Sequence, residues 1–182
     1  MRATDIVIAV GWIAFWSYWL VASANAKPGR TQWTRFALVR VALFVVIVVL
    51  FRIRALHDLT LTHSALLHGV GLAAFFAGLA LAVWARIYIG RNWGMPMSQK
   101  IDPELVTSGP YRVVRHPIYS GVILAMIGTA IAISWDWLVV AVLLGAYFVY
   151  SAFVEERTMT ERFPDTYPRY RKSSKMLIPY IF

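Results

Sequence analysis

The feature that most limits what this chain can fold into is a series of apolar runs, each close to the length that crosses a lipid bilayer. A helix needs roughly 20 apolar residues to span a hydrocarbon core of about 30 Å. Five runs come close to this length, at residues 5–24, 36–51, 65–85, 118–134 and 137–154. Of all residues, 59% are hydrophobic and 15% are charged. In soluble domains about half of the residues are hydrophobic and about a quarter are charged. The sequence therefore predicts an all-α integral membrane protein with five transmembrane helices, forming a single membrane domain over residues 1–182.

The distribution of Lys and Arg predicts which side of the membrane each connection occupies. If all five runs cross, then residues 25–35, residues 86–117 and the tail from residue 155 share one side. These segments carry fourteen of the eighteen Lys and Arg residues. Positively charged connections stay in the cytoplasm. We therefore expect the N-terminus outside the cell and the C-terminus in the cytoplasm.

The first apolar run ends in a pattern that resembles a signal-peptidase site, Ala24-Asn25-Ala26. A cleaved signal peptide starts with its N-terminus inside, so every later crossing would reverse. The fourteen positive residues would then lie outside, against the positive-inside rule. We therefore expect the first run to remain as a transmembrane helix.

Composition also excludes several classes of site. Cysteine is absent, which excludes disulfides, thiolate metal sites and a cysteine nucleophile. The formal charge is +9, but the basic residues lie in short connections between apolar runs, which favours anionic lipid over nucleic acid. The spacing of His57, His63 and His68 does not put all three on one helical face, so we expect no metal site there.

The last two apolar runs are separated only by Ser134, Trp135 and Asp136, which predicts a tight antiparallel hairpin. Small residues recur every four positions in the first of the two, at Gly121, Ala125 and Thr129, with Gly128 and Ala132 nearby. Small residues at this interval allow helix backbones to approach closely in lipid, although they are also common in membrane helices generally. In either case the hairpin brings the residues before 118 and those after 154 to the same side.

A cluster of ionisable residues is expected at the mouth of this hairpin. Arg115 and His116 enter it, and Glu155 and Glu156 leave it. Adjacent carboxylates raise each other's pKa unless cations are close, and Arg112, Arg115 and Arg157 are available. The cluster has two interpretations: an interfacial salt-bridge network that anchors the hairpin, or a site for a charged, zwitterionic cofactor.

Three motifs around this cluster carry a family resemblance. R-H-P-x-Y-x-G spans residues 115–121, the glutamate pair follows at 155–156, and F-x-x-x-Y-x-x-Y spans 163–170, with a closing proline at 179. In this order, over residues 105–182, they resemble the isoprenylcysteine carboxyl methyltransferase family, especially its bacterial branch. The bacterial branch implies a location in the inner membrane. The site-forming region would comprise residues 86–117 and 155–182.

The resemblance implies a transferase that moves a methyl group from S-adenosylmethionine to a lipophilic, membrane-associated acceptor, a small molecule or a lipidated substrate. It implies a catalytic role for Arg115, near the acceptor, and for Glu156. It also implies a set of residues that bind the cofactor: Tyr111, His116, Pro117, Tyr119, Glu155, Glu156 and Tyr167.

The acceptor group stays open between two chemistries. A carboxylate, with a pKa near 4, is already ionised at neutral pH and needs no general base. An amine has to lose a proton first, and His116 is then the candidate base, with a glutamate second. Related phospholipid methyltransferases, which share a similar R-H-P-x-Y element and glutamate pair, act on head-group amines. We take the carboxylate as the first expectation.

Two other functions share parts of the pattern. Sterol reductases, which use NADPH, resemble the R-H-P-x-Y element and the final residues, but they are usually much longer. A non-catalytic membrane subunit would explain the charge cluster as a salt-bridge network alone. Around the cluster we expect one short helix near residues 155–163 and a tail that wraps back over the site. We also expect Trp93 to be an interface anchor, with Asn92 able to reach the site.

Overall fold

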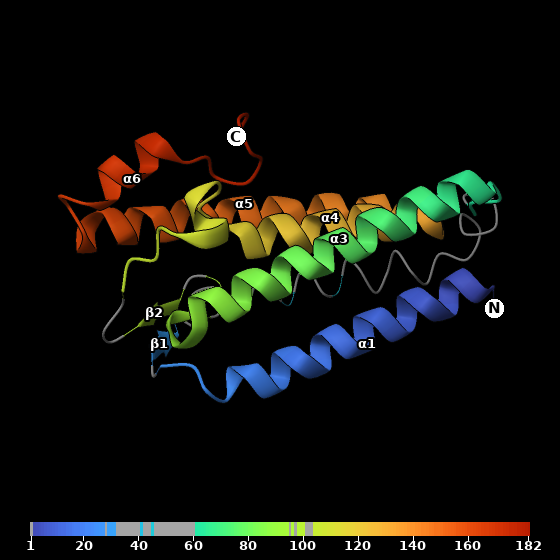
Figure 1. The fold of residues 1–182 in the computed structure, drawn as a ribbon, viewed down its shortest axis with the longest axis horizontal. Coiled ribbons are helices and arrows are strands. Elements are labelled where there is room, and N and C mark those ends of the chain that lie inside the picture. Colours follow the sequence, from blue (N-terminus) through green and yellow to red (C-terminus); the bar gives the residue numbers. More distant parts are fainter. Residues whose placement is uncertain are drawn as a thin grey trace.

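A computed structural model of the chain describes residues 2–27, 29–31, 61–94, 96, 98–100 and 104–182, together with Val41 and Val45. Apart from these two valines, the apolar run predicted to cross at residues 36–51 lies outside the described residues, as does His57. Apart from two short strands, the regular elements of the described part of the chain are helices, as the sequence predicts (Figure 1).

Four of the five predicted crossings correspond to described helices. Their bounds are α1 Ala3–Ser23, α3 Ala65–Ile89, α4 Pro117–Ala132 and α5 Trp137–Arg162. A shorter helix α6 covers Tyr167–Ser173, and the 3₁₀ helices η2 and η3 cover Gly90–Asn92 and Gly109–Arg112. By length and composition, α1, α5 and α3 with η2 can cross a bilayer, whereas α4 has only 16 residues.

A small two-stranded sheet, which the sequence did not predict, joins two connections. Strand β1, Gly29–Thr31, pairs antiparallel with β2, Ser98–Lys100. Nearby, the Lys27 amide donates to the Arg91 carbonyl over 2.8 Å. These contacts hold the residues after α1 against those after α3.

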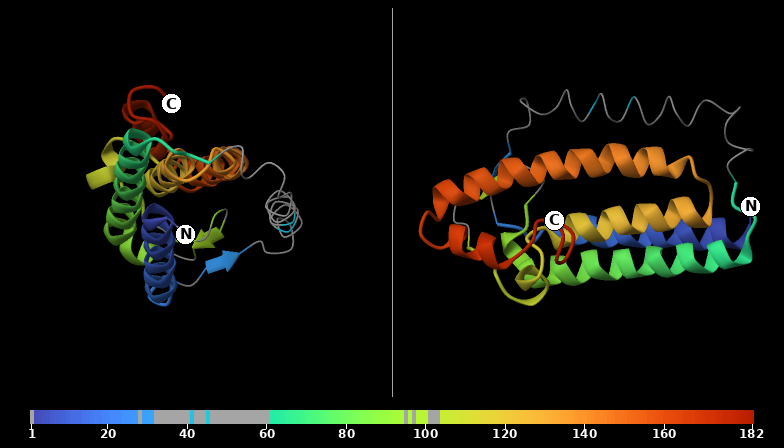
Figure 2. Two further views of the ribbon diagram at one scale, coloured as in Figure 1. Left: turned by 90° about the vertical axis from the view of Figure 1, so that its right-hand side faces the viewer. Right: turned by 90° about the horizontal axis from the view of Figure 1, so that it is seen from above.

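The helices α1, α3 and α5 run in one direction and α4 runs in the other (Figures 1 and 2). At one end of the bundle, the Arg2 guanidinium donates to the Ile133 carbonyl oxygen over 3.0 Å. At the other end, Arg86 donates to the Ala22 carbonyl oxygen over 2.5 Å. We call this second end, where α4 begins, the Pro117 end. The C-terminal ends of α1, α3 and α5 therefore lie at the same end of the bundle as the start of α4.

The closest helix contact is between α3 and α4, and it is made by the small residues. A Cβ atom added to Gly121 would lie 2.6 Å from the Gly78 carbonyl oxygen, and one added to Gly71 would lie 2.5 Å from the Ala132 amide nitrogen. Such distances leave no room for a side chain. The small residues of α4 thus form a helix interface as the spacing allowed, and the sequence did not reveal that α3 is the partner.

The predicted hairpin is present, since α4 ends at Ala132 and α5 begins at Trp137. The short separate helix predicted near residues 155–163 is wrong, because α5 continues without a break to Arg162. No Gly or Pro occurs from residue 146 to residue 163, so nothing interrupts the helix before Pro164. The short helix is α6 instead.

The α3–α4 contact predicts different outcomes for two glycines of the same helix. Gly78→Ala puts a methyl group 2.5 Å from the Gly121 carbonyl oxygen, and overpacking of this kind costs about 1–3 kcal/mol. Gly69→Ala is the matched control, because nothing lies within 4 Å of its added Cβ. We expect the first variant to lose unfolding free energy in mixed detergent micelles and the second to lose none. Equal losses in both would contradict the interface.

Candidate active site

The segment that enters α4 is held by the chain's final residues. The amides of Arg115 and His116 donate to the carbonyl oxygens of Lys175 and Met176 over 2.8 and 3.1 Å. The Ser120 hydroxyl donates to the Leu177 carbonyl oxygen over 2.6 Å. Pro117 follows at the first position of α4, where a missing N–H costs nothing. The tail therefore wraps back over the cluster as predicted, and we call residues 174–182 the tail strap.

A buried ion pair joins the segment before α4 to α5. Arg115 Nε lies 2.6 Å from Glu156 Oε1, and the two side chains are only 7% and 4% exposed. The same guanidinium donates through Nη1 to the Ser174 carbonyl oxygen over 2.5 Å. Arg171 Nε approaches the other oxygen of Glu156 at 3.3 Å. Glu156 is thus enclosed by two arginines.

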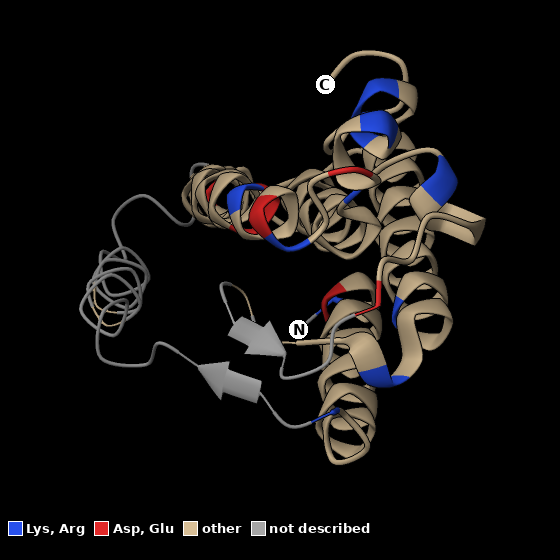
Figure 3. Cartoon of the chain, turned by 90° about the vertical axis from the view of Figure 1, so that its left-hand side faces the viewer, with Lys and Arg blue, Asp and Glu red and all other residues tan. Residues whose placement is uncertain are grey.

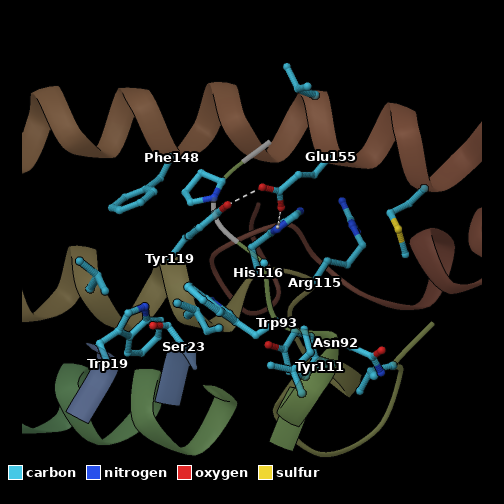
Figure 4. Close-up of a pocket in the computed structure, with 18 of the residues that line it drawn as sticks. Trp19, Ser23, Asn92, Trp93, Tyr111, Arg115, His116, Tyr119, Phe148 and Glu155 are labelled. Carbon is cyan, nitrogen blue, oxygen red and sulfur yellow. Dashed lines mark hydrogen bonds and ion pairs between the residues drawn. The ribbon is translucent and has the colours of Figure 1, made fainter. Parts of the chain in front are cut away.

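Glu155 points to a different side of α5, because successive residues of a helix are roughly 100° apart. Its Oε1 accepts a hydrogen bond from the Tyr119 hydroxyl over 2.5 Å (Figure 4). His116 lies between the two glutamates, with Nδ1 3.5 Å from Glu155 Oε2 and Nε2 3.6 Å from Glu156 Oε1. The imidazole also stacks on the Tyr119 ring, at 5.4 Å between centroids. Both ring nitrogens of His116 therefore face carboxylates.

A cavity of about 980 Å³ lies beside this cluster. Near the Pro117 end its wall is polar and aromatic, with Tyr111, Arg115, His116, Tyr119, Glu155 and Tyr167. Farther along the bundle its wall is apolar, with Trp12, Phe15, Met126, Val140, Leu144 and Phe148. One continuous space therefore joins charged groups to a long hydrophobic chamber.

The predicted site residues divide into two groups around this cavity. Six of them line it, namely Tyr111, Arg115, His116, Tyr119, Glu155 and Tyr167. Pro117 is buried at the start of α4, and Glu156 faces a smaller recess of about 390 Å³ beside Arg157 and Arg171. The structure thus brings the predicted residues together, but it separates the two glutamates by the side of α5 that each one faces.

The cations at the glutamate pair differ in part from those expected. Arg115 is present, but Arg112 is exposed and Arg157 pairs with Glu161 over 3.3 Å on the surface. The second cation beside Glu156 is Arg171 of α6. The sequence could not reveal this exchange, because it depends on the turn at Pro164 that folds α6 back.

Sequence reasoning also missed the contribution of α1. Trp12, Trp16 and Trp19 all line the cavity, and their spacing of four and three residues places them on one helical face. Trp93 was expected to be an interface anchor, but it lines the cavity and packs edge to face against Trp19 at 5.6 Å. The spacing of tryptophans within an otherwise apolar helix was the only available signal.

Two groups outside the helices that could cross the membrane stabilise the loops of the site. The Tyr170 hydroxyl donates to the Tyr111 carbonyl oxygen over 2.5 Å, and burial raises the pKa of Tyr170 to about 12. It therefore stays a neutral donor at physiological pH. Hydrogen bonds from Lys27 and Asn92 lower the pKa of Glu104, so this carboxylate stays ionised. Asn92 itself lines the cavity.

Among the residues that the structure describes, no three His, Asp or Glu side chains are grouped as metal ligands.

The chain is similar to methyltransferases of three kinds. The sequence profile of the phospholipid methyltransferase family matches residues 66–166. A curated methanethiol S-methyltransferase from a Pseudomonas species is 25% identical over 120 residues, which are 61% of this chain and 46% of that protein. The solved structure of a eukaryotic intramembrane Ras methyltransferase, an isoprenylcysteine carboxyl methyltransferase, matches with a TM-score of 0.57 at 24% identity, over 84% of this chain and 55% of that chain. The chain thus spans about half the length of both proteins, and the resemblance read from its motifs is confirmed.

The buried ion pair predicts a stability effect that an exposed pair on the same helix lacks. Glu156→Gln leaves Arg115 buried with its main partner neutralised, and breaking a buried pair in this way costs about 3–5 kcal/mol. Glu161→Gln is the control, because exposed pairs such as Arg157–Glu161 contribute less than about 1 kcal/mol. Unfolding in mixed micelles measures both. A Glu156 variant as stable as the Glu161 variant would show that the pair does not hold the fold together.

Proposed function

Because the chain belongs to the phospholipid methyltransferase family, we propose that it catalyses S-adenosylmethionine-dependent methyl transfer to a lipophilic, membrane-associated acceptor. The observation that carries this proposal is the single cavity that unites the charged cluster with an apolar chamber. A site for a polar cofactor and a site for a hydrophobic acceptor have to share one space if a group is to pass directly between them.

The residues at the polar end fit such a cofactor. When bound, S-adenosylmethionine supplies a methyl group on a positively charged sulfur. Glu155 offers a carboxylate toward the cavity for the cationic and hydroxyl groups of the ligand, and the rings of Tyr111 and Trp93 can face a cation. His116 also lines the cavity, with its imidazole held between the two glutamates at 3.5 and 3.6 Å.

The acceptor's nucleophile in this proposal is a carboxylate. Both nitrogens of His116 face glutamates, so neither is placed to take a proton from an acceptor. A carboxylate is already ionised: its oxygen bonds to the methyl carbon while the carbon–sulfur bond breaks, and no proton is transferred. Arg115 lines the cavity and adds positive charge near the acceptor. We assign Glu156, which faces away from the cavity, the role of positioning Arg115 and His116 rather than touching the ligands.

The proposal includes the predicted arrangement in the membrane. α1 and α3 run in the same direction, and two helices that cross a bilayer in the same direction need a crossing between them, which supports five crossings with one at residues 36–51. Many of the Lys and Arg residues belong to the segments at the Pro117 end, which faces the viewer in Figure 3. This supports a cytoplasmic C-terminal tail at the pocket and an external N-terminus. We propose one membrane domain over residues 1–182 in the inner membrane of a bacterium.

We expect the Glu155 side chain to contribute to cofactor binding but not to the stability of the fold. We expect Glu155→Gln to weaken binding of S-adenosylhomocysteine about 10- to 100-fold, since hydrogen bonds to a charged group contribute about 1.5–3 kcal/mol. The thermal midpoint should stay close to that of the parent chain. Calorimetric titration in detergent measures the affinity, with Glu161→Gln as the control on the same helix.

Two outcomes of that titration would contradict the proposal. Saturable heat from NADPH with none from S-adenosylhomocysteine would favour a reductase. Full affinity in the Glu155 variant would remove this carboxylate from the cofactor site.

The acceptor should depend on the apolar chamber. Membranes containing the protein and methyl-labelled S-adenosylmethionine should yield lipid-extractable label that mild base releases as methanol, as a methyl ester does. Leu144→Trp fills the chamber and should abolish this label while cofactor binding persists. Val142→Trp, on the exposed side of α5, is the control. Label that is stable to base would indicate an amine acceptor instead of a carboxylate. The proposal of methyl transfer would still stand.

A further inference from the structure

The tail strap has an inner face and an outer face. Ser174, Met176 and Leu177 are buried against the cluster. Beyond them the exposed side chains are large and apolar, with Tyr180 at 90% and Ile181 at 76%, and with Ile178 and Phe182 also open. In water, so many adjacent exposed apolar side chains are unfavourable.

Backbone groups at the end of the tail strap are hydrogen-bonded to one another. The amides of Leu177 and Ile178 both donate to the Phe182 main-chain oxygen, over 2.7 and 2.5 Å, and the Phe182 amide donates to the Ile178 oxygen over 3.0 Å. Tyr180 has a φ of 67°, which is rare for a bulky residue and turns the chain sharply at the tip. A loop hydrated on all sides does not need this closure, whereas a loop in hydrocarbon does, because water is absent there.

The depth of the tail strap follows from the length of α4. Sixteen residues span about 24 Å, roughly 6 Å less than a hydrocarbon core. The end of α4 is held at the other surface, where the Thr62 amide donates to the Ile133 oxygen over 2.9 Å and Trp135 is exposed. Pro117 therefore lies below the membrane surface on its own side. The strap is hydrogen-bonded to the two residues before Pro117, so it lies at the same depth.

We propose that residues 178–182 insert into the acyl chains of the leaflet at the Pro117 end, so that the tail strap is a lipid-facing wall of the site. It lies between the hydrocarbon and the Arg115–Glu156 pair, where the shortness of α4 leaves a gap. The basic residues that precede the tail strap, Arg171 and Lys172, are suited to anionic head groups at the interface. Figure 3 shows Lys and Arg along the chain next to this loop. This lipid contact is independent of the proposed methyl transfer.

The absence of cysteine makes a direct test possible. Ile181→Cys, labelled with an environment-sensitive fluorophore in lipid vesicles, reports the surroundings of the tip. Arg169→Cys on the exposed side of α6 is the matched control. We expect acyl-chain spin labels to quench the fluorophore at residue 181 roughly threefold more strongly than at residue 169, as insertion of about 5–10 Å requires. Aqueous iodide should show the opposite order.

A second position, Ile178→Cys, guards against local disturbance by the label at residue 181. Iodide quenching at both positions equal to that at residue 169 would place the tail strap in water and overturn the proposal. Protection from both quenchers would also overturn it, because the tip would then be covered by protein, such as a second copy of the chain. Neither readout requires activity, so failure here leaves the methyltransferase proposal standing.

Discussion

The buried pair between Arg115 and Glu156 is the interaction on which the site depends. It joins the segment before α4, the last third of α5 and, through the Ser174 carbonyl oxygen, the tail strap. Removing two charges from water is expensive, and their attraction offsets this cost only when further hydrogen bonds satisfy the remaining atoms. Here the carbonyl oxygens of Arg171 and Ser174 accept hydrogen bonds from Arg115, and the Arg171 side chain adds a second ion pair to Glu156. The pair therefore fixes the relative position of three segments that are far apart in the sequence.

The contact between α3 and α4 sets the position of this pair along the bundle. Glycines at the crossing let the two backbones touch, and this contact leaves α4 no freedom to slide along α3. Because α4 is short, with 16 residues, α3 and α5, with 25 and 26 residues, extend beyond its first residue at the Pro117 end. A recess results beside the start of α4, which has polar groups at its mouth and side chains of α1, α4 and α5 along its length.

The sequence predicted the parts of this arrangement that depend on local pattern. Apolar length located four described helices, and the three-residue link at Ser134 required the hairpin that brings Arg115 near Glu156. It could not predict contacts that depend on helix rotation and tertiary packing. Apolar helices in lipid carry little amphipathic signal, so the sequence did not show that α3 is the partner of the small residues or that α1 faces the cavity. The exchange of Arg157 for Arg171 likewise follows from rotation, because Arg157 is one residue beyond Glu156 and turns to the surface.

The adjacent glutamates explain how one helix can hold the fold and face a ligand at the same level. Neighbouring positions on α5 differ by roughly 100° in direction, so Glu156 turns toward the arginines while Glu155 turns toward the cavity. His116 lies between the two glutamates and contacts both. The position of the buried Glu156 carboxylate therefore constrains that of Glu155. The polar end is thus built by residues 111–177, whereas α1, which lies outside the matched family region, contributes tryptophans to the apolar end. Under the proposed function, a change of acceptor would therefore require changes mainly in the apolar wall, while the polar end could keep its geometry.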